Sequence, residues 1–216
     1  SVLKTLVCFG DSNTHGTPPM RRDDDKRRLE YERRWTGVAA NLLGSGWRVV
    51  EEGLPGRTTV HDDPIEGRHK NGLLALPMVL ESHRPIDMLV IMLGTNDLKT
   101  RFSVTAADIA CSAGKLVEAA ASWPCWSDDA NPRVLLVCPA PIAEVGTLRD
   151  MFAGGLEKSN LLAGQFAEIA GRLNCEFLDA GTIVTSSSID GVHLDESAHQ
   201  ALGVAIGQKI KTLHQE

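Results

Sequence analysis

Residues 3–16 read LKTLVCFGDSNTHG, an apolar run followed by a polar turn. The apolar side chains up to Phe9 predict a buried strand that ends at Gly10. Ser12 would then stand at the carboxyl end of that strand, at the edge of an open α/β sheet where ligands bind. The turn leads into a helix whose free N–H groups favour negative charge. Taken alone, Ser12 is also an ordinary turn or helix-cap residue, so the rest of the chain must decide between these roles.

Four further apolar runs follow, and segments of helical periodicity lie between them. The expected strands are residues 3–10, 47–53, 87–94, 133–141 and 175–181. The expected helices are residues 31–43, 72–83, 104–122, 158–173 and 195–213, with Thr105 and Asp195 as N-caps. Strands that alternate with helices predict a parallel sheet covered on both faces. We therefore expect an α/β fold, a three-layer α/β/α arrangement with a five-stranded parallel sheet, in a single domain over residues 1–216.

Composition sets limits on partners and location. The chain has 216 residues, a net charge of −6 and 43% hydrophobic residues, which gives no support to nucleic-acid or anionic-membrane binding. The five cysteines are odd in number and form no C-x-x-C pair, so neither a disulfide framework nor a metal site is indicated, and no cofactor is expected. Cys8, Cys138 and Cys175 lie in or beside apolar runs and are predicted core residues. With no signal-peptide pattern at its start, the protein is expected to be cytoplasmic.

Three other polar turns occupy places equivalent to that of Ser12. EEGLPGRTT (51–59) ends the second expected strand, GTND (94–97) ends the third, and DGVH (190–193) precedes the last helix. Each has an ordinary interpretation: Gly56 as part of a Pro-Gly turn, Asn96 as a helix cap, and Asp190 as a turn residue beside an incidental His193. Because all of these turns would converge on one edge of a doubly wound sheet, their joint occurrence favours a functional site.

The residue types in these turns fit ester hydrolysis. This reaction needs a hydroxyl nucleophile, a base beside it, a group that orients the base, and donors for the developing oxyanion. Ser12 supplies the nucleophile, His193 the base and Asp190 the orienting carboxylate. The backbone N–H of Gly56 and the amide of Asn96 supply donors, together with the N–H of Ser12.

In this order, the blocks FGDSNTHG, EEGLPGRTT, GTND and DGVH resemble those of the GDSL/SGNH hydrolases, a family of serine esterases. The resemblance implies a flavodoxin-like fold, a Ser12, Asp190 and His193 triad, and an oxyanion hole from Ser12, Gly56 and Asn96. The strings RRWTGVAANL, EEGLPGRTT and VIMLGTND further resemble the bacterial arylesterase and acyltransferase branch. That branch implies cleavage of short acyl esters, acyl transfer to alcohols or peroxide, and assembly into tetramers or octamers.

Two departures from the family pattern concern local chemistry. Glu51 stands where the second block commonly opens with Asn. In the first block, Asn13 and His15 replace residues that are frequently apolar or aromatic among relatives. We predict that Asn13 and His15 bind the substrate. Their polar surroundings should favour acyl groups of about two to four carbons, because extra methylenes add binding free energy only in an apolar pocket.

Several alternatives stay open. A carbohydrate O-deacetylase or a thioesterase would use the same triad, and a flavodoxin-like binding module would use none, since fold does not imply activity. The chain contains no G-x-S-x-G elbow, which disfavours the α/β-hydrolase fold. His15 and His199 are rivals of His193 for the role of base, although His199 is expected on the last helix.

The long loops 15–30, 54–71, 122–132 and 142–156 are expected to carry function or contacts. Trp123 and Trp126 suit an oligomer contact, a small core or a sugar-stacking platform. Together with Met151 and Phe152, they would expose unusual apolar surface on a monomer, which predicts a homo-oligomer. The expected partners are a small-molecule ester and further copies of this chain.

Overall fold

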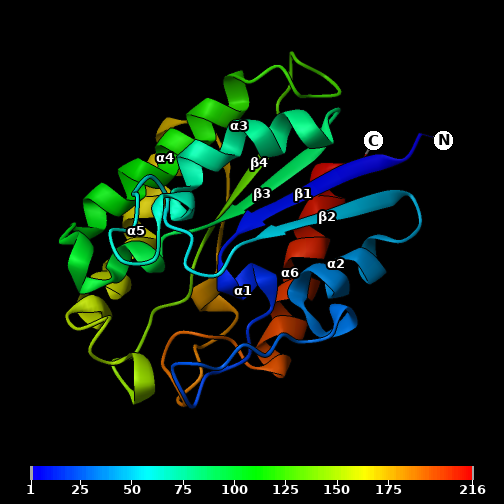
Figure 1. The fold of residues 1–216 in the computed structure, drawn as a ribbon. Helices are drawn as coiled ribbons and strands as arrows, with labels where there is room; N and C mark the ends of the chain where they lie inside the picture. Colours follow the sequence, from blue (N-terminus) through cyan, green and yellow to red (C-terminus); the bar gives the residue numbers. More distant parts are fainter. Residues whose placement is uncertain (1, 216) are drawn as a thin grey trace.

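The computed structural model describes residues 2–215 and has a central parallel sheet between two layers of helices (Figure 1). The strands are β1 (Lys4–Gly10), β2 (Trp47–Gly53), β3 (Met88–Met92), β4 (Val134–Cys138) and β5 (Glu176–Asp179). Their order is β2-β1-β3-β4-β5, and every neighbouring pair is parallel. This is the flavodoxin-like order, and it confirms the predicted fold class.

Five long helices cover the sheet. One face packs against α3 (Gly72–His83), α4 (Ala106–Ser122) and α5 (Gly155–Arg172), and the other against α2 (Trp35–Leu43) and α6 (Glu196–Leu213). Figure 1 shows these two groups on opposite sides of the strands. None of the helices described between residues 2 and 215 has the length and apolar character needed to cross a membrane.

The pleat of the strands divides the core in two. In β1, Val7 and Phe9 belong to the cluster beneath α3, α4 and α5, whereas Leu6 and Cys8 belong to the cluster beneath α2 and α6. Successive side chains of a strand point to opposite faces, so a sheet covered on both sides needs continuous apolar runs. β3 and β4 are buried along their whole length for this reason.

The expected elements are present, with shifted ends. Thr105 and Asp195 cap α4 and α6 as predicted, each accepting a backbone N–H three residues on. The expected helix 31–43 is divided, because Arg34 is extended between the 3-10 turn Tyr31–Arg33 and α2. α5 begins at Gly155, three residues before its expected start at Lys158.

The cysteine and tryptophan predictions are confirmed in part. Cys8 and Cys138 are buried, as expected, whereas Cys175 is half-buried. Trp126 is also buried and donates its indole N–H to the Ala120 carbonyl, and Trp123 packs against the same core cluster. Trp126 is therefore a core residue, and Trp123 lies half-buried against the same core, as the small-core alternative predicts.

The carboxyl edge of the sheet carries one further short helix, α1 (Ser12–His15), in the direct continuation of β1. It lies against the end of β2 so closely that a Cβ on Gly53 would come within 2.3 Å of the His15 backbone nitrogen. A glycine at this position therefore lets the nucleophile turn sit directly on the sheet.

Candidate active site

The turn that carries Ser12 is built by its neighbours. Asp11 caps α1 by accepting the N–H of Asn13 at 2.9 Å, and Gly16 ends the helix in the left-handed region at φ 99°. A cap and a glycine stop thus hold a helix of a single turn at the end of β1.

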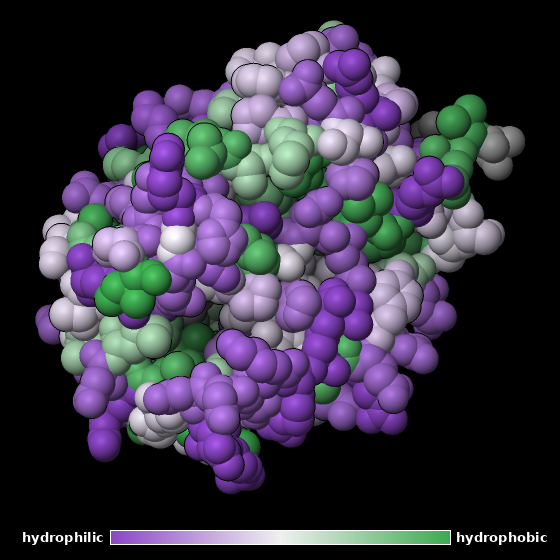
Figure 2. All heavy atoms as spheres, in the orientation of Figure 1, coloured by the Kyte–Doolittle hydropathy of each residue, from purple (hydrophilic) through white to green (hydrophobic). Residues whose placement is uncertain are grey.

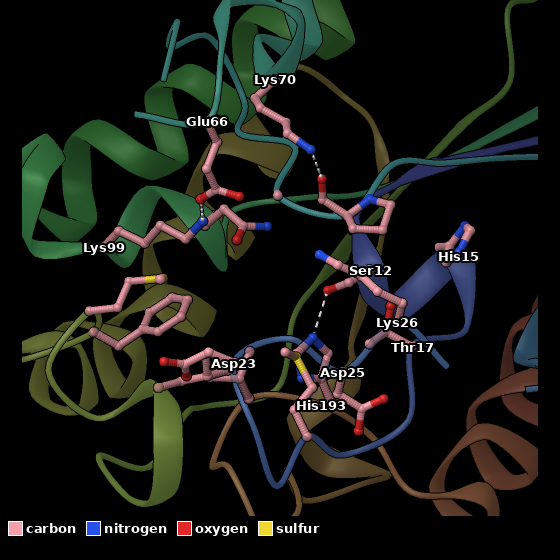
Figure 3. Close-up of a pocket in the computed structure, with 18 of the residues that line it drawn as sticks. Ser12, His15, Thr17, Asp23, Asp25, Lys26, Glu66, Lys70, Lys99 and His193 are labelled. Carbon is pink, nitrogen blue, oxygen red and sulfur yellow. Dashed lines mark hydrogen bonds and ion pairs between the residues drawn. The ribbon is translucent and has the colours of Figure 1, made fainter. Parts of the chain in front are cut away.

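Three side chains from the two ends of the chain meet at this edge. The Ser12 hydroxyl lies 2.9 Å from Nε2 of His193, and Nδ1 of the same ring lies 2.7 Å from Oδ2 of Asp190. Figure 3 shows this Ser12–His193 bond as a dashed line among the residues that line a pocket. All three residues are buried. The structure therefore brings the predicted nucleophile, base and orienting carboxylate into one continuous hydrogen-bonded series.

The Asp190 carboxylate has four donors. Oδ1 accepts the N–H groups of Val192 and His193, both at 2.9 Å, and Oδ2 accepts the N–H of Met20 at 2.7 Å besides the His193 ring. Burial acts to raise the pKa of Asp190, but the bonds from His193 and Met20 outweigh it and hold the pKa below its ordinary value. An ionised carboxylate fixes Nδ1 as the protonated nitrogen, which leaves Nε2 as an acceptor facing Ser12.

Asn13, which was predicted to bind the substrate, instead bonds to the backbone on either side of His193. Its Nδ2 donates to the Val192 carbonyl at 3.1 Å, and its Oδ1 accepts the Leu194 N–H at 3.2 Å. These partners flank His193, so Asn13 fastens the His193 loop to the nucleophile turn. Asn13 is not among the residues that line the cavity beside Ser12. Asn13 therefore positions the His193 loop, and the structure does not place it at the cavity where its substrate contact was predicted.

The predicted oxyanion donors lie beside Ser12. Gly56 and Asn96 both line the cavity that Ser12 and His193 line. Among residues 2–215, the N–H of Gly56 donates to no other group. The Asn96 Nδ2 donates to the Arg57 carbonyl at 3.1 Å and, over a longer 3.4 Å, to Oδ2 of Asp11. Asn96 thus keeps one strong bond that orients its amide and one weak bond that a ligand oxygen can replace.

A buried pair of charges lies beneath these donors. The Arg57 guanidinium donates to the Gly10 and Glu52 carbonyls, at the ends of β1 and β2, and stacks 4.2 Å from the Phe9 ring centroid. Burial raises the pKa of Asp11 to about 6, against the opposing effects of the Asn13 N–H and the charges of His193 and Arg57. Sequence patterns could not identify this pair, because Asp11 follows β1 and Arg57 follows β2, 46 positions later.

Asp97, the last residue of GTND, bonds to the loop that carries Gly56. Its carboxylate accepts both the N–H of Thr59, at 2.9 Å, and the Thr59 hydroxyl, and it lies 3.5 Å from Nε2 of His61. Asp97 therefore ties the loop of Gly56 to the turn of Asn96, which sets the spacing of the two donors.

The cavity above Ser12 has a volume of about 310 Å³, which is at the lower end of small-molecule sites. Its lining includes five apolar side chains, those of Met20, Leu148, Met151, Phe152 and Val192. Glu66, Lys70 and Lys99 form a charged wall, and Asp23 and Asp25 lie across the pocket from it, on the side of His193 (Figure 3). In Figure 2, hydrophilic atoms gather over the segment of residues 17–30 at the bottom of the view. Sequence patterns do not reveal this charged wall, because its members come from separate loops that carry no motif.

The two rival histidines have other surroundings. His15 lines the cavity, as expected for a substrate contact, and burial together with the nearby Arg28 and Arg34 lowers its pKa. His199 is fully buried on α6, and its Nδ1 accepts the N–H of Trp35 at 3.0 Å, which caps α2. Neither ring is hydrogen-bonded to Ser12 in the described chain.

The five cysteines are all free. Over residues 2–215 the structure brings no three His, Cys, Asp or Glu side chains together as a candidate metal site.

A hydroxyl, an imidazole and a carboxylate joined in series, at the ligand-binding edge of a flavodoxin-like sheet, define a serine hydrolase. The chain matches the model of the GDSL-like lipase/acylhydrolase family over residues 8–201 and belongs to that family. It is a carboxylic ester hydrolase, as its similarity to solved esterases also indicates.

Three solved structures illustrate this similarity. Est24, a carbohydrate acetylesterase from Sinorhizobium meliloti, is 41% identical with a TM-score of 0.90, and an aryl esterase from M. smegmatis is 37% identical with a TM-score of 0.90. A putative arylesterase from Agrobacterium tumefaciens is 34% identical with a TM-score of 0.86. Each match covers 97% of this chain and 99% of the other. A comparison with curated protein sequences gives no match.

Proposed function

We propose that this chain hydrolyses short-chain acyl esters, aryl or alkyl, through an acyl-enzyme on Ser12. The observation that carries the proposal is the unbroken series from the Ser12 hydroxyl through His193 to Asp190, which opens into a cavity. A covalent serine mechanism needs this series, and a binding module does not.

In the acylation step, the Ser12 hydroxyl attacks the ester carbonyl while Nε2 of His193 takes its proton. The negative charge that develops on the carbonyl oxygen is stabilised by the N–H groups of Ser12 and Gly56 and by the Asn96 amide. The imidazolium, stabilised by Asp190, then donates the proton to the departing alcohol oxygen.

In the deacylation step, water takes the place of the alcohol. His193 removes a proton from the water as it attacks the acyl carbon, and the proton returns to the Ser12 oxygen when the acid leaves. If an alcohol or peroxide enters instead of water, the acyl group is transferred, which we retain as a secondary activity of the same site.

A carbohydrate O-deacetylase is the second candidate, and one observation favours it. Two solved carbohydrate acetylesterases from Sinorhizobium meliloti are 41% and 36% identical to this chain over almost all of its length. The chemistry on the acyl side is the same, so the two candidates differ only in the alcohol half of the substrate.

Two measurements test the proposal. Incubation with an organophosphate should add one phosphoryl group to Ser12 in the mass spectrum of a peptide digest. A protein that stays unlabelled and inactive would contradict the serine mechanism. A panel of p-nitrophenyl esters should show kcat/KM falling from short to long chains, because a cavity of about 310 Å³ leaves little room for added methylenes. A higher kcat/KM for a twelve-carbon ester than for the acetate would contradict the short-chain preference.

We further propose that the protein is a homo-oligomer, a tetramer or octamer. The aromatic residues expected at the contact are largely buried within the subunit, so the support now comes from α3. Its Leu74 and Met78 are 59% and 66% exposed, and Figure 2 shows hydrophobic atoms gathered in that region. Light scattering at micromolar concentration should give a multiple of the 23.3 kDa subunit mass, and a monomer mass would refute the proposal.

A further inference from the structure

A lysine and a glutamate form a pair on the charged wall of the cavity. The Lys99 Nζ donates to Oε2 of Glu66 at 2.6 Å, and both residues line the same cavity as Ser12 and His193. Figure 3 shows the pair across the pocket from His193. Lys99 ends the turn that begins with Asn96, and its backbone N–H bonds to the Asn96 carbonyl. The pair therefore stands next to the proposed oxyanion donors.

Lys99 has unused donors. Its side chain is only 4% exposed, and an ammonium group carries three N–H donors. The single hydrogen bond that its Nζ makes within residues 2–215 is the one to Glu66. The nearest aromatic ring, that of Phe152, lies 5.9 Å from Nζ and offers no strong acceptor. A buried ammonium with two unused donors is costly, and this points to a ligand that brings oxygen acceptors.

Glu66 has an unused acceptor. Its Oε2 receives Lys99 and, at 3.4 Å, Arg101, whereas its Oε1 receives no hydrogen bond within the described chain. Oε1 lies beside Gly56, since a Cβ built on that glycine would be 3.1 Å from it. A free carboxylate oxygen and free ammonium N–H groups are thus presented side by side.

We propose that Glu66 and Lys99 form a subsite for hydroxyl groups on the alcohol half of the substrate. Each hydroxyl is both a donor and an acceptor, so neighbouring hydroxyls can donate to Oε1 of Glu66 and accept from Nζ of Lys99. This inference rests on the proposed esterase function. An unsubstituted acetyl, propionyl or butyryl group carries no hydroxyl, so the hydroxyl groups that this pair recognises belong to the alcohol. Among the esters that this site hydrolyses, the preferred alcohol is therefore a polyol or sugar, which favours the second of the two candidate functions.

The charges around the pair favour a neutral ligand over a carboxylate. Glu66 already balances the charge of Lys99 at 2.6 Å, and it would repel an anion that approached the same ammonium. Lys70, the next cation on this wall, is held by a bond to the Pro55 carbonyl at 2.6 Å.

Three acetate esters of similar size test the proposal: 1-monoacetylglycerol, n-propyl acetate, which lacks the two hydroxyls, and 3-acetoxypropanoate, which carries a carboxylate. Acetate release is measured for the wild type and for Lys99→Met and Glu66→Gln. Lys115→Met is the control, because Lys115 forms an exposed ion pair with Glu118 on α4. Activity on propyl acetate shows that each variant is folded and that the esterase function itself is present.

The wild type should favour monoacetylglycerol over propyl acetate by about tenfold or more in kcat/KM, as expected for one or two buried hydrogen bonds. Lys99→Met and Glu66→Gln should each reduce this ratio by about tenfold or bring it near one, and Lys115→Met should leave it unchanged. Equal losses on both esters, or a wild-type ratio near one, would overturn the subsite. A preference for 3-acetoxypropanoate would overturn the neutral-ligand assignment. Failure to hydrolyse any of the esters would instead overturn the proposed function.

Discussion

Replacing Asp190 with asparagine keeps the shape of the side chain and removes its charge. In the structure, Oδ2 receives two donors, the Nδ1–H of His193 and the N–H of Met20, both at 2.7 Å. Oδ1 receives two backbone N–H groups at 2.9 Å. Asparagine has one oxygen and can accept at only one of these two positions. If its oxygen takes the position of Oδ1, its NH₂ group takes the position of Oδ2 and faces the two donors there.

His193 can then accept a hydrogen bond from this NH₂ group at Nδ1 only if its own proton moves to Nε2. That nitrogen lies 2.9 Å from the Ser12 hydroxyl and would no longer accept its proton. The wrong tautomer in a serine triad costs about 10⁴-fold in kcat, or about 5.5 kcal/mol of activation free energy. The Met20 N–H also loses a charged acceptor, which should lower the free energy of unfolding by about 2 kcal/mol.

The assay is hydrolysis of p-nitrophenyl acetate under conditions in which circular dichroism shows the Asp190→Asn protein to be folded. Asp195→Asn is the matched control, because Asp195 caps α6 through the Ala198 N–H and asparagine caps nearly as well. The control should keep kcat within about twofold of the wild type. A folded Asp190→Asn protein with a tenth of the wild-type kcat would refute the assigned role of Asp190.

Three other predictions follow from the same geometry. Ser12→Ala and His193→Ala should each lower kcat on p-nitrophenyl acetate by about 10⁴-fold, and the double variant should be little worse, because triad members act as a unit; a folded His193→Ala protein with a tenth of the activity would refute the triad. Asn96→Ala should lower kcat by about 100-fold with little change in KM, because one oxyanion donor is lost. An unchanged kcat would show that Asn96 has only a structural role. His199→Asn should keep kcat within about tenfold, since this ring caps a helix away from Ser12. Burial lowers the pKa of His199 to about 4, so between about pH 6.5 and pH 4 the unfolded chain binds this proton and the folded chain does not, and the free energy of unfolding falls on acidification. In urea unfolding, the free energy of unfolding of His199→Asn should fall by roughly 2 to 3 kcal/mol less over this range than that of the wild type. Equal decreases would contradict this prediction.

The sheet and its helices could be predicted because their signals are local. Apolar runs such as residues 87–94 and helical periodicity such as residues 195–213 depend only on spacing along the chain. Their ends were less certain. The break at Arg34 arises because its guanidinium bonds to the Leu29 carbonyl and to Glu51, which stands where the family often has asparagine.

The residues that meet at the carboxyl edge of the sheet could also be identified from the sequence. Ser12, Asn96 and His193 follow strands or precede a helix, and parallel topology brings such positions together. The fold class therefore placed them on one edge before any distance was known.

By itself, the sequence determined the α/β fold, the family and the turns that form the site, because apolar periodicity and motif spacing are local properties. Only the tertiary structure decided what individual polar side chains do there. Asn13 reaches across to the backbone beside His193, and Glu66 meets Lys99 across 33 positions of sequence. A buried polar group must find a partner or pay the cost of desolvation, and that partner depends on which loops the fold brings together, for which no sequence interval gives a signal.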